Sequence, residues 1–187
     1  MPFDPAQPAA NSPLASQVMR DQFNALKALI DAVPVPPVPP ATAYGKVGAD
    51  WTSGSASFVD VTGLAFAVAA GESWTAEVAL AVVSGTTGQG LKFRVSGPGA
   101  ASVMIAMLGT GSGGTSTSID CEVQTAFAVA SPAKTFCAGS SLPGVVRVHV
   151  VVTNASAGSV QLQASNSSGS GTVTIKANSD LLARRTG

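Results

Sequence analysis

Apolar residues near the start of the chain recur at alternating steps of four and three positions. The five residues that define this spacing are Met19, Phe23, Leu26, Ile30 and Val33. An a/d repeat of this kind places every member on one seam of a helix. Ser12 is a favourable N-cap, Pro13 suits the first helical position, and Pro34 disfavours a helical residue before it. We therefore predict an amphipathic helix within residues 12–33.

The seam of this helix needs a partner, because a lone helix of about twenty residues is only marginally stable in water. It can pack on its own domain or against helices of other copies. The run Pro-Val-Pro-Pro-Val-Pro-Pro at residues 34–40 favours the second arrangement. A polyproline II segment rises about 3.1 Å per residue and would hold helix and body roughly 20 Å apart. Two heptads do not distinguish a dimer from a trimer.

From Tyr44 onward the hydrophobic pattern changes to period two, in short segments rich in β-branched and aromatic residues. The predicted strands are 57–61, 64–68, 74–82, 91–95, 103–108, 119–123, 126–129, 145–152, 159–164 and 172–177. Gly-, Pro- and Ser-rich turn signals separate them and no helical segment intervenes, which favours antiparallel sheets. The predicted fold is mainly β: an antiparallel jelly-roll β-sandwich preceded by one N-terminal α-helix and a polyproline linker.

The same patterns divide the chain into four parts. Residues 1–11 are expected to form an extended anchor segment, 12–33 an amphipathic oligomerisation helix, 34–43 a Pro-rich linker and 44–187 a β-sandwich domain. The last part, of about 145 residues, is long enough for one ordinary domain with its own core.

The predicted strand 145–152 carries apolar side chains on both faces. One face is entirely valine, whereas the other combines Arg147 and His149 with Val145 and Val151. A strand that is buried on one side and meets another subunit on the other would have this pattern. An ordinary central strand would have it too, so the sequence leaves both interpretations open.

Composition and charge narrow the functional classes. Charged residues make up 11% of the chain, the formal net charge is zero, and the basic residues are scattered apart from Arg184 and Arg185. This argues against a nucleic-acid partner. No apolar run has the length of a membrane span, and residues 1–5 lack the features of a secretory signal. We expect no membrane partner, and assembly in the cytoplasm of the producing cell.

Side chains suited to catalysis or metal binding are few. His149 is the only histidine, and we expect it to be a satisfied strand residue within the sandwich. Asp120 and Glu122 share a strand face that we interpret as solvated rather than as a cation site or an acid/base pair. The glycine runs 85–90 and 109–114 lack the helix and the Lys-Ser/Thr of a phosphate loop. We therefore expect no enzyme activity, no cofactor and no metal.

Cys121 and Cys137 are the only cysteines of the chain. Two buried free thiols are the usual state in a protein that assembles in the cytoplasm. One bridge that closes a short loop is the alternative, and the sequence leaves both states open.

Several segments of the predicted β-domain resemble virion proteins of tailed bacteriophages. Residues 158–168 and 172–185 read GSVQLQASNSS and TVTIKANSDLLARR, and they resemble the closing strands of β-sandwich domains in these proteins. Residues 61–66, 70–74 and 90–93 are similar to the start of the same domains. These segments lie across most of the predicted β-domain.

The N-terminal region carries a related resemblance. Residues 11–14 and 19–30 resemble the anchoring region of phage head-fibre and tail-associated proteins, where a Pro- or Gly-rich stalk often follows. The resemblance implies a trimeric virion fibre or decoration protein with a jelly-roll head of the general kind seen in tumour necrosis factor and complement C1q. Asp180 departs from the pattern, because the terminal motif usually carries Tyr or another bulky residue there.

The tethered layout and the resemblance together predict a structural virion protein, a homotrimeric head fibre or capsid decoration protein. Its location would be the virion, after assembly in the host cytoplasm, and its partners would be phage capsid or tail proteins. The anchor is expected at the N-terminal residues Pro2, Phe3, Pro5 and Pro8.

Two other functional classes are compatible with a projecting β-domain. The alternative is a tail-associated fibre or receptor-binding module that recognises a host surface glycan or protein through the loops at 109–114 and 139–144. An enzyme such as a depolymerase would need paired carboxylates or a nucleophile with its base, and the chain offers no convincing set.

Overall fold

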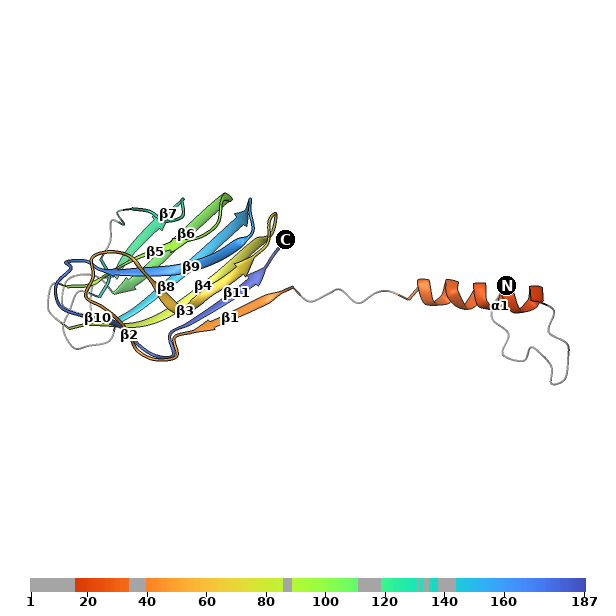
Figure 1. Ribbon diagram of the computed structural model, residues 1–187, viewed down its shortest axis with the longest axis horizontal. Coiled ribbons are helices and arrows are strands. Elements are labelled where there is room, and N and C mark those ends of the chain that lie inside the picture. Colours follow the sequence, from red (N-terminus) through yellow and green to blue (C-terminus); the bar gives the residue numbers. More distant parts are fainter. Residues whose placement is uncertain are drawn as a thin grey trace. The chain divides into compact units, whose positions relative to one another are not determined.

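A computed structural model describes residues 16–33, 40–85, 89–110, 119–130, 132, 135–137 and 144–187. The chain divides into two compact units, residues 1–39 and residues 40–187, each with its own architecture. Among the described residues, the first unit contains one helix and the second contains eleven strands (Figure 1). The elements are α1 (Ser16–Asp31), β1 (Thr42–Lys46), β2 (Trp51–Ser53), β3 (Val59–Val68), β4 (Ser73–Ser84), β5 (Leu91–Ser96), β6 (Ala100–Thr110), β7 (Ile119–Gln124), β8 (Gly144–Asn154), β9 (Gly158–Asn166), β10 (Val173–Ile175) and β11 (Asp180–Arg185).

The strands form two antiparallel sheets that pack as a sandwich (Figure 1). The larger sheet, sheet A, has the order β1-β11-β4-β8-β6-β7, with β10 beside β4 and β2 beside β10. The smaller sheet, sheet B, has the order β3-β9-β5. Strands that follow each other in the chain, such as β3 and β4 or β8 and β9, therefore lie in different sheets. This jelly-roll-like arrangement confirms the predicted mainly β, antiparallel sandwich with one N-terminal helix.

The core lies between the two sheets and follows the period-two pattern of the sequence. β4 buries every second residue from Trp74 onward, and β8 buries its valines at positions 146, 148, 150 and 152. Phe93 and Phe136 are fully buried, with ring centroids 6.0 Å apart. Each large apolar side chain buried in this way stabilises the fold by about 1.5–3 kcal/mol, so the second unit has a core of its own.

Two strands predicted separately, 57–61 and 64–68, belong to one strand, β3, which contains a bulge. The pairing of β3 with β9 shifts register between Asp60 and Ala65. Gly63 lies within this irregular segment at a φ of 89°, a conformation that glycine adopts without steric cost. The glycine that reads as a strand break therefore keeps one strand continuous through a local kink.

The side chain of Gln161 completes the hydrogen bonding of this bulge. Its amide donates to the carbonyl oxygens of Val61 and Leu64, at 2.9 and 3.2 Å. Both carbonyls lie in the irregular segment, where the regular ladder does not serve them. A strand glutamine on the neighbouring β9 thus supplies the donor that the bulged backbone needs.

β1 and β3 approach each other closely at two glycines. A Cβ atom on Gly63 would lie 2.1 Å from the carbonyl oxygen of Lys46, and one on Gly45 would lie 2.3 Å from the carbonyl oxygen of Gly63. No side chain fits at these distances, so both positions need glycine. The contact joins an edge of sheet A to an edge of sheet B.

The strand prediction differs from the structure at both ends of the second unit. β1, β2 and β11 were not predicted as strands, and β1 begins at Thr42, inside the predicted linker 34–43. The predicted strand at 126–129 is wrong, because these residues form a turn in which Ala128 has a φ of 52°. Its N–H donates to the carbonyl oxygen of Val95 at 2.8 Å, which holds the turn against β5.

α1 ends two residues earlier than the predicted seam requires. The helix spans Ser16–Asp31, so Val33 lies beyond its end, and that part of the prediction is wrong. The N–H of Val33 bonds to the carbonyl oxygen of Ile30 at 3.1 Å, three residues back rather than four. A tightened final turn of this kind is common at helix ends, and the following Pro34 disfavours continuation.

Candidate functional site

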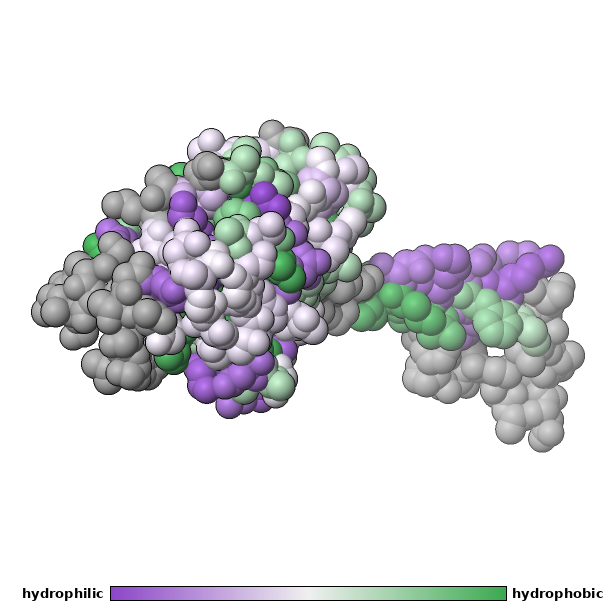
Figure 2. Space-filling model, turned by 60° about the vertical axis from the view of Figure 1, so that its left-hand side comes forward, coloured by the Kyte–Doolittle hydropathy of each residue, from purple (hydrophilic) through white to green (hydrophobic). Residues whose placement is uncertain are grey.

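One side of α1 is apolar and exposed. Met19, Phe23, Leu26 and Ile30 are between 41% and 63% exposed. Figure 2 shows the apolar residues as a stripe along one side of the helix and hydrophilic residues along the other. Leu29 was not predicted as part of the seam, but it is exposed as well and widens the stripe at the neighbouring g position. These residues form the α1 seam.

The polar side of α1 adds little to its stability. Lys27 forms an exposed ion pair with Asp31, and Gln17 donates to Asp21 at 2.9 Å, both across one helical turn. Pairs of this type stabilise a helix by only about 0.2–0.5 kcal/mol each. A helix of sixteen residues therefore depends on burial of its seam for most of its stability.

The outer face of sheet A carries a second exposed apolar surface. Six side chains of β6, β7 and β8 alternate with the inward-facing residues and are between 38% and 72% exposed. We call this surface the apolar face. Its residues are Met104, Leu108, Ile119, Val123, Val145 and Val151.

Strand register joins the apolar residues of β6 and β7, while on β8 Arg147 and His149 separate Val145 from Val151. Met104 of β6 lies opposite Val151 of β8, and Leu108 of β6 lies opposite Cys121 of β7. Side chains in such positions have their Cβ atoms about 4.5–5.5 Å apart. β8 is therefore a central strand with its valine face in the core and its other face exposed.

Charged side chains enter the apolar face on β8, where Arg147 and His149 lie between Val145 and Val151 and opposite Leu108 and Ala106 of β6. His149 of β8 lies opposite Glu77 of β4, and its Nδ1 is 3.0 Å from the Glu77 carboxylate. Arg147 follows on the same face. His149 is a hydrogen-bonded strand residue, as predicted, but it points outward from sheet A and does not lie within the sandwich. β6 has no charged residue at all, and both charged residues of β7 point inward.

The inward side of β7 is polar, which corrects the expectation of a solvated acidic face. Glu122 is buried and Asp120 is half-buried, because the odd-numbered apolar residues of β7 point outward instead. The amide of Gln124 donates to the Glu122 carboxylate at 2.9 Å and to the carbonyl oxygen of Phe93 at 3.2 Å. Glu122 and Gln124 thus form a hydrogen-bonded layer between β7 and β5.

A row of polar side chains crosses the outer face of sheet B. Asp60, Gln163 and Arg94 lie opposite one another on β3, β9 and β5. The Gln163 amide donates to Asp60 and accepts from Nε of Arg94, both at 2.7 Å. The Arg94 guanidinium lies 4.4 Å from the ring centre of Phe58. Nothing else in the described part of the chain bonds to the two NH2 groups of Arg94, so this polar row keeps donors for a ligand.

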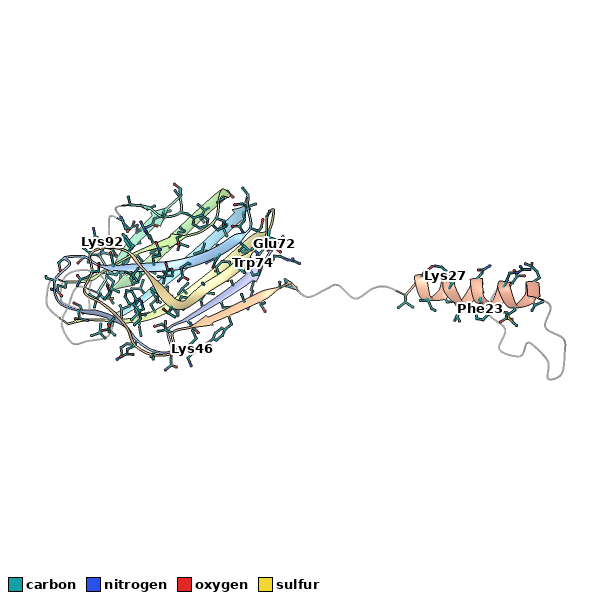
Figure 3. The ribbon with its side chains drawn as sticks, in the orientation of Figure 1. Phe23, Lys27, Lys46, Glu72, Trp74 and Lys92 are labelled. Atoms are coloured by element: carbon teal, nitrogen blue, oxygen red, sulfur yellow. The ribbon has the colours of Figure 1, made fainter. Side chains whose placement is uncertain are left out.

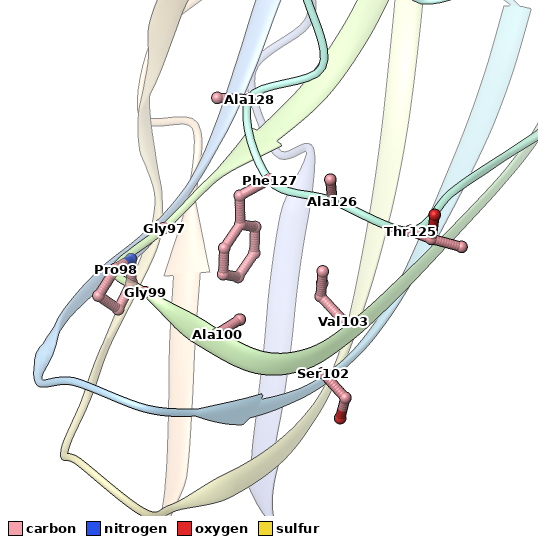
Figure 4. A pocket seen from close by; sticks show the side chains of 10 residues that line it. All are labelled: Gly97, Pro98, Gly99, Ala100, Ser102, Val103, Thr125, Ala126, Phe127 and Ala128. Carbon is pink, nitrogen blue, oxygen red and sulfur yellow. The ribbon is translucent and has the colours of Figure 1, made fainter.

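A shallow hollow of about 450 Å³ lies beside the β5–β6 turn (Figure 4). It is lined by residues 97–100, Ser102 and Val103 on one side and by residues 125–128 on the other. The Phe127 ring packs so closely on Gly97 that a Cβ there would lie 2.6 Å from it. The lining contains no charged side chain, so it offers no acid, base or anion-binding group.

Glu72 ties the end of the chain to the start of β4. Its carboxylate accepts from the N–H of Ala69 at 2.8 Å, from Trp74 Nε1 at 2.9 Å and from Arg185 at 3.0 Å. Glu72 and Trp74 lie close together in Figure 3. The hydrogen bond from the Ala69 backbone, followed by those from Trp74 and Arg185, lowers the pKa of Glu72 to about 2. This arrangement is a structural clasp.

Both cysteines are free in the structure. Cys121 is exposed on the outer face of β7, whereas Cys137 is buried beside Thr110, at 2.8 Å between Sγ and Oγ1. The expected pair of buried thiols therefore holds for Cys137 only, and the bridge is not formed. Burial raises the pKa of the Cys137 thiol. Cys121 is the more accessible of the two because it is exposed.

Part of the predicted site lies outside the described residues. This applies to the anchor residues Pro2, Phe3, Pro5 and Pro8, to Ser12 and Pro13, and to most of the two loops proposed for receptor binding. In the part that the structure describes, no three His, Cys, Asp or Glu side chains gather as a metal site. Its one helix also falls short of the length and hydrophobicity of a membrane span.

The fold and these surfaces define a two-sheet β-sandwich with a separate amphipathic helix. No protein-family model and no curated protein sequence matches the chain. Among solved structures, it has a weak similarity to the Gx strain of infectious bursal disease virus, with 11% identity, a TM-score of 0.26, and coverage of 82% of this chain and 40% of that one. The VP2 subviral particle of this virus has 8% identity, a TM-score of 0.23, and coverage of 78% of this chain and 37% of that one. The Gt strain has 11% identity, a TM-score of 0.22, and coverage of 82% of this chain and 41% of that one. The chain thus aligns with about two fifths of the length of these viral proteins, and its fold assignment rests on its own strand order.

Proposed function

We propose that this chain is a structural protein of a tailed-phage virion, a homotrimeric head fibre or capsid decoration protein. In this role the N-terminal region attaches to phage capsid or tail proteins, and the β-sandwich projects from the virion. The observation that carries the proposal is the exposed α1 seam in a unit separate from the sandwich. The resemblance of the N-terminal and closing segments to phage virion proteins is the basis for proposing a virion location and a trimeric state.

Self-association is the simplest way to bury the α1 seam. A second copy presents the same apolar stripe at the same spacing, and a/d residues of two or three helices interlock side by side. The seam combines Phe23 and Ile30 at a positions with Met19 and Leu26 at d positions. The Lys27–Asp31 pair lies beside the seam, where it stays in water after association.

Light scattering on the full chain tests the assembly. The wild type is expected to have the mass of three chains, and the double variant Phe23→Asp/Ile30→Asp that of one, because buried carboxylates oppose association. Asn24→Asp is the control for an added carboxylate, since it places one negative charge on the side away from the seam. A wild-type protein that stays monomeric at micromolar concentration would contradict the proposal.

The location of the protein is tested on intact particles. Antibodies against the β-sandwich, applied to purified phage particles and imaged by electron microscopy, are expected to label regular positions on the head or the tail. A protein found only in the soluble fraction of the lysate, with unlabelled particles, would refute the virion assignment.

A second candidate function is recognition of a host surface glycan, and the polar row of sheet B favours it. A carboxylate, an amide and a guanidinium lie in line beside the Phe58 ring, which are groups that orient sugar hydroxyl and carboxylate groups. A glycan array with the full chain tests this function. Binding to acidic glycans that is lost in Arg94→Ala and retained in Arg184→Ala would support it, and an array without signal would dismiss it.

A further inference from the structure

We propose that the apolar face of β6, β7 and β8 is covered in the assembled protein by a second copy of this chain. The β-sandwiches would then contact each other directly, in addition to the helices. This inference rests on the proposed self-association through α1, and it assigns a second subunit contact that the helix alone does not require.

The size and composition of the apolar face call for a partner. The area of the face follows from strand geometry. Three strands spaced about 4.8 Å apart, each rising about 3.4 Å per residue along the length of the face, cover roughly 300 Å². Exposed apolar patches of about this size are often functional in monomeric proteins. Six large apolar side chains form this one, and β6 and β7 add no charged side chain to it, while β8 adds Arg147 and His149 between Val145 and Val151. A surface with this apolar majority and two basic side chains along one strand suits another protein surface.

The limited area of the face selects a second copy over an unrelated protein. A standard protein interface buries about 800 Å² on each partner. The apolar face provides less than half of that, so a freely diffusing partner would not be held by it alone. A partner that is already tethered nearby can occupy a face of this area, because its binding does not depend on the small interface alone. Copies joined through α1 are tethered in this way, and the face continues an assembly that the seam begins.

The chain between helix and sandwich is short enough for the contact. The segment from Val33 to Thr42 spans at most roughly 30 Å when fully extended, at about 3.3–3.6 Å per residue. Short tethers give effective concentrations in the millimolar range. Association of the helices therefore presents the sandwiches to each other at a concentration where a weak contact is largely formed.

Cys121 is a built-in probe of this contact. It lies opposite Leu108, on the outward side of β7, and is exposed in the single chain. Covering the apolar face would shield its thiol. Labelling of the full chain with a maleimide, read by peptide mass spectrometry, distinguishes Cys121 from the buried Cys137. Cys121 is expected to react at least about tenfold more slowly in the wild-type assembly than in the Phe23→Asp/Ile30→Asp variant.

The outcomes separate this inference from the proposed function. If the wild type is an oligomer but its Cys121 reacts as fast as in the double variant, the inference is overturned and the helix-mediated assembly stands. If the wild type is monomeric and Cys121 reacts equally fast in both proteins, the assembly itself is refuted, and the inference with it. Slow labelling in the wild type and in Asn24→Asp, with fast labelling in the double variant, supports both.

A variant of the face itself gives an independent measurement. Val123→Asp places a carboxylate at an exposed position on the β7 side of the face, where the core is not disturbed. At concentrations where the wild type is fully assembled, this variant is expected to keep the oligomer mass and to label rapidly at Cys121. Thr42→Asp is the matched control on an exposed position of β1. Slow labelling in a folded, assembled Val123→Asp protein would overturn the inference.

Discussion

Phe23→Ala is expected to weaken assembly by an amount that follows from the exposure of this side chain. Phe23 is 63% exposed in the single chain, and complete burial of a phenylalanine contributes about 1.5–3 kcal/mol, so association has about 1–2 kcal/mol left to gain per subunit. A trimer loses this three times, about 3–6 kcal/mol, which lowers its association constant roughly 10²–10⁴-fold at about 1.4 kcal/mol per factor of ten. Because the midpoint concentration of a trimer follows the square root of that constant, it rises roughly 10–100-fold.

Sedimentation equilibrium of the full chain over a wide concentration range measures this midpoint. Asn24→Ala is the control, since it brings a similar gain in helix propensity on the opposite side of α1. The expected result is a large rise in the midpoint for Phe23→Ala and a small shift for Asn24→Ala. Equal midpoints for the two variants would refute the assignment of the seam as the subunit contact.

Three further perturbations test the sandwich and its surfaces. Gly63→Ala forces a side chain into a φ of 89° and against a carbonyl oxygen. It is expected to lower the free energy of unfolding by at least about 2 kcal/mol and the Tm in calorimetry by roughly 4–8 °C. The control is Gly48→Ala, whose Cβ points into open space and which is expected to leave the Tm unchanged. The pKa of Glu72 is lowered from 4.5 to about 2, so its stabilising contribution is complete above pH 4.5 and is lost as the pH falls toward 2. In urea unfolding between pH 2 and 5, the free energy of unfolding of Glu72→Gln should therefore depend less on pH than that of the wild type. An equal pH dependence in both proteins would contradict the stabilising role of the Glu72 hydrogen bonds. A ring of three copies joins unlike patches, and Leu182 is exposed on β11, next to the edge strand β1 at the far side of sheet A. Leu182→Asp is therefore expected to speed maleimide labelling of Cys121 in the assembled protein, while unchanged labelling would exclude this side of the sheet as the counter-surface.

The sequence predicts the strands whose burial alternates and misses those that depend on distant partners. β4, β5 and β8 bury every second residue, so period two identifies them directly. β11 reads Asp-Leu-Leu-Ala-Arg-Arg, a composition without strand propensity, and it is a strand because it pairs with β1 and β4. β1 itself is polar and pairs only with β11. Such pairing depends on tertiary context, which local pattern does not encode.

The candidate surfaces were predictable to different degrees. The α1 seam follows from spacing alone, because the residues that share a helix face are fixed by its geometry. The apolar face was signalled only by the mixed pattern of residues 145–152. Its β6 and β7 members could not be added from the sequence, since their neighbourhood arises from the pairing of β6 with both β8 and β7. The same lack of strand order explains why Asp120 and Glu122 were assigned to the wrong side of β7.

The α1 seam and the apolar face are each too small to hold two copies together firmly, and a short linker between them strengthens both contacts. α1 has only five seam residues within its helical span, and the face offers roughly 300 Å², so each contact alone is marginal. Joined by a short linker, each contact raises the effective concentration for the other. This coupling is reciprocal, because it is a difference of binding free energies. Val123→Asp should therefore raise the midpoint of assembly by the square root of the factor by which the intact face raises the trimer association constant, and a midpoint identical to that of the wild type would mean that the sandwiches do not touch.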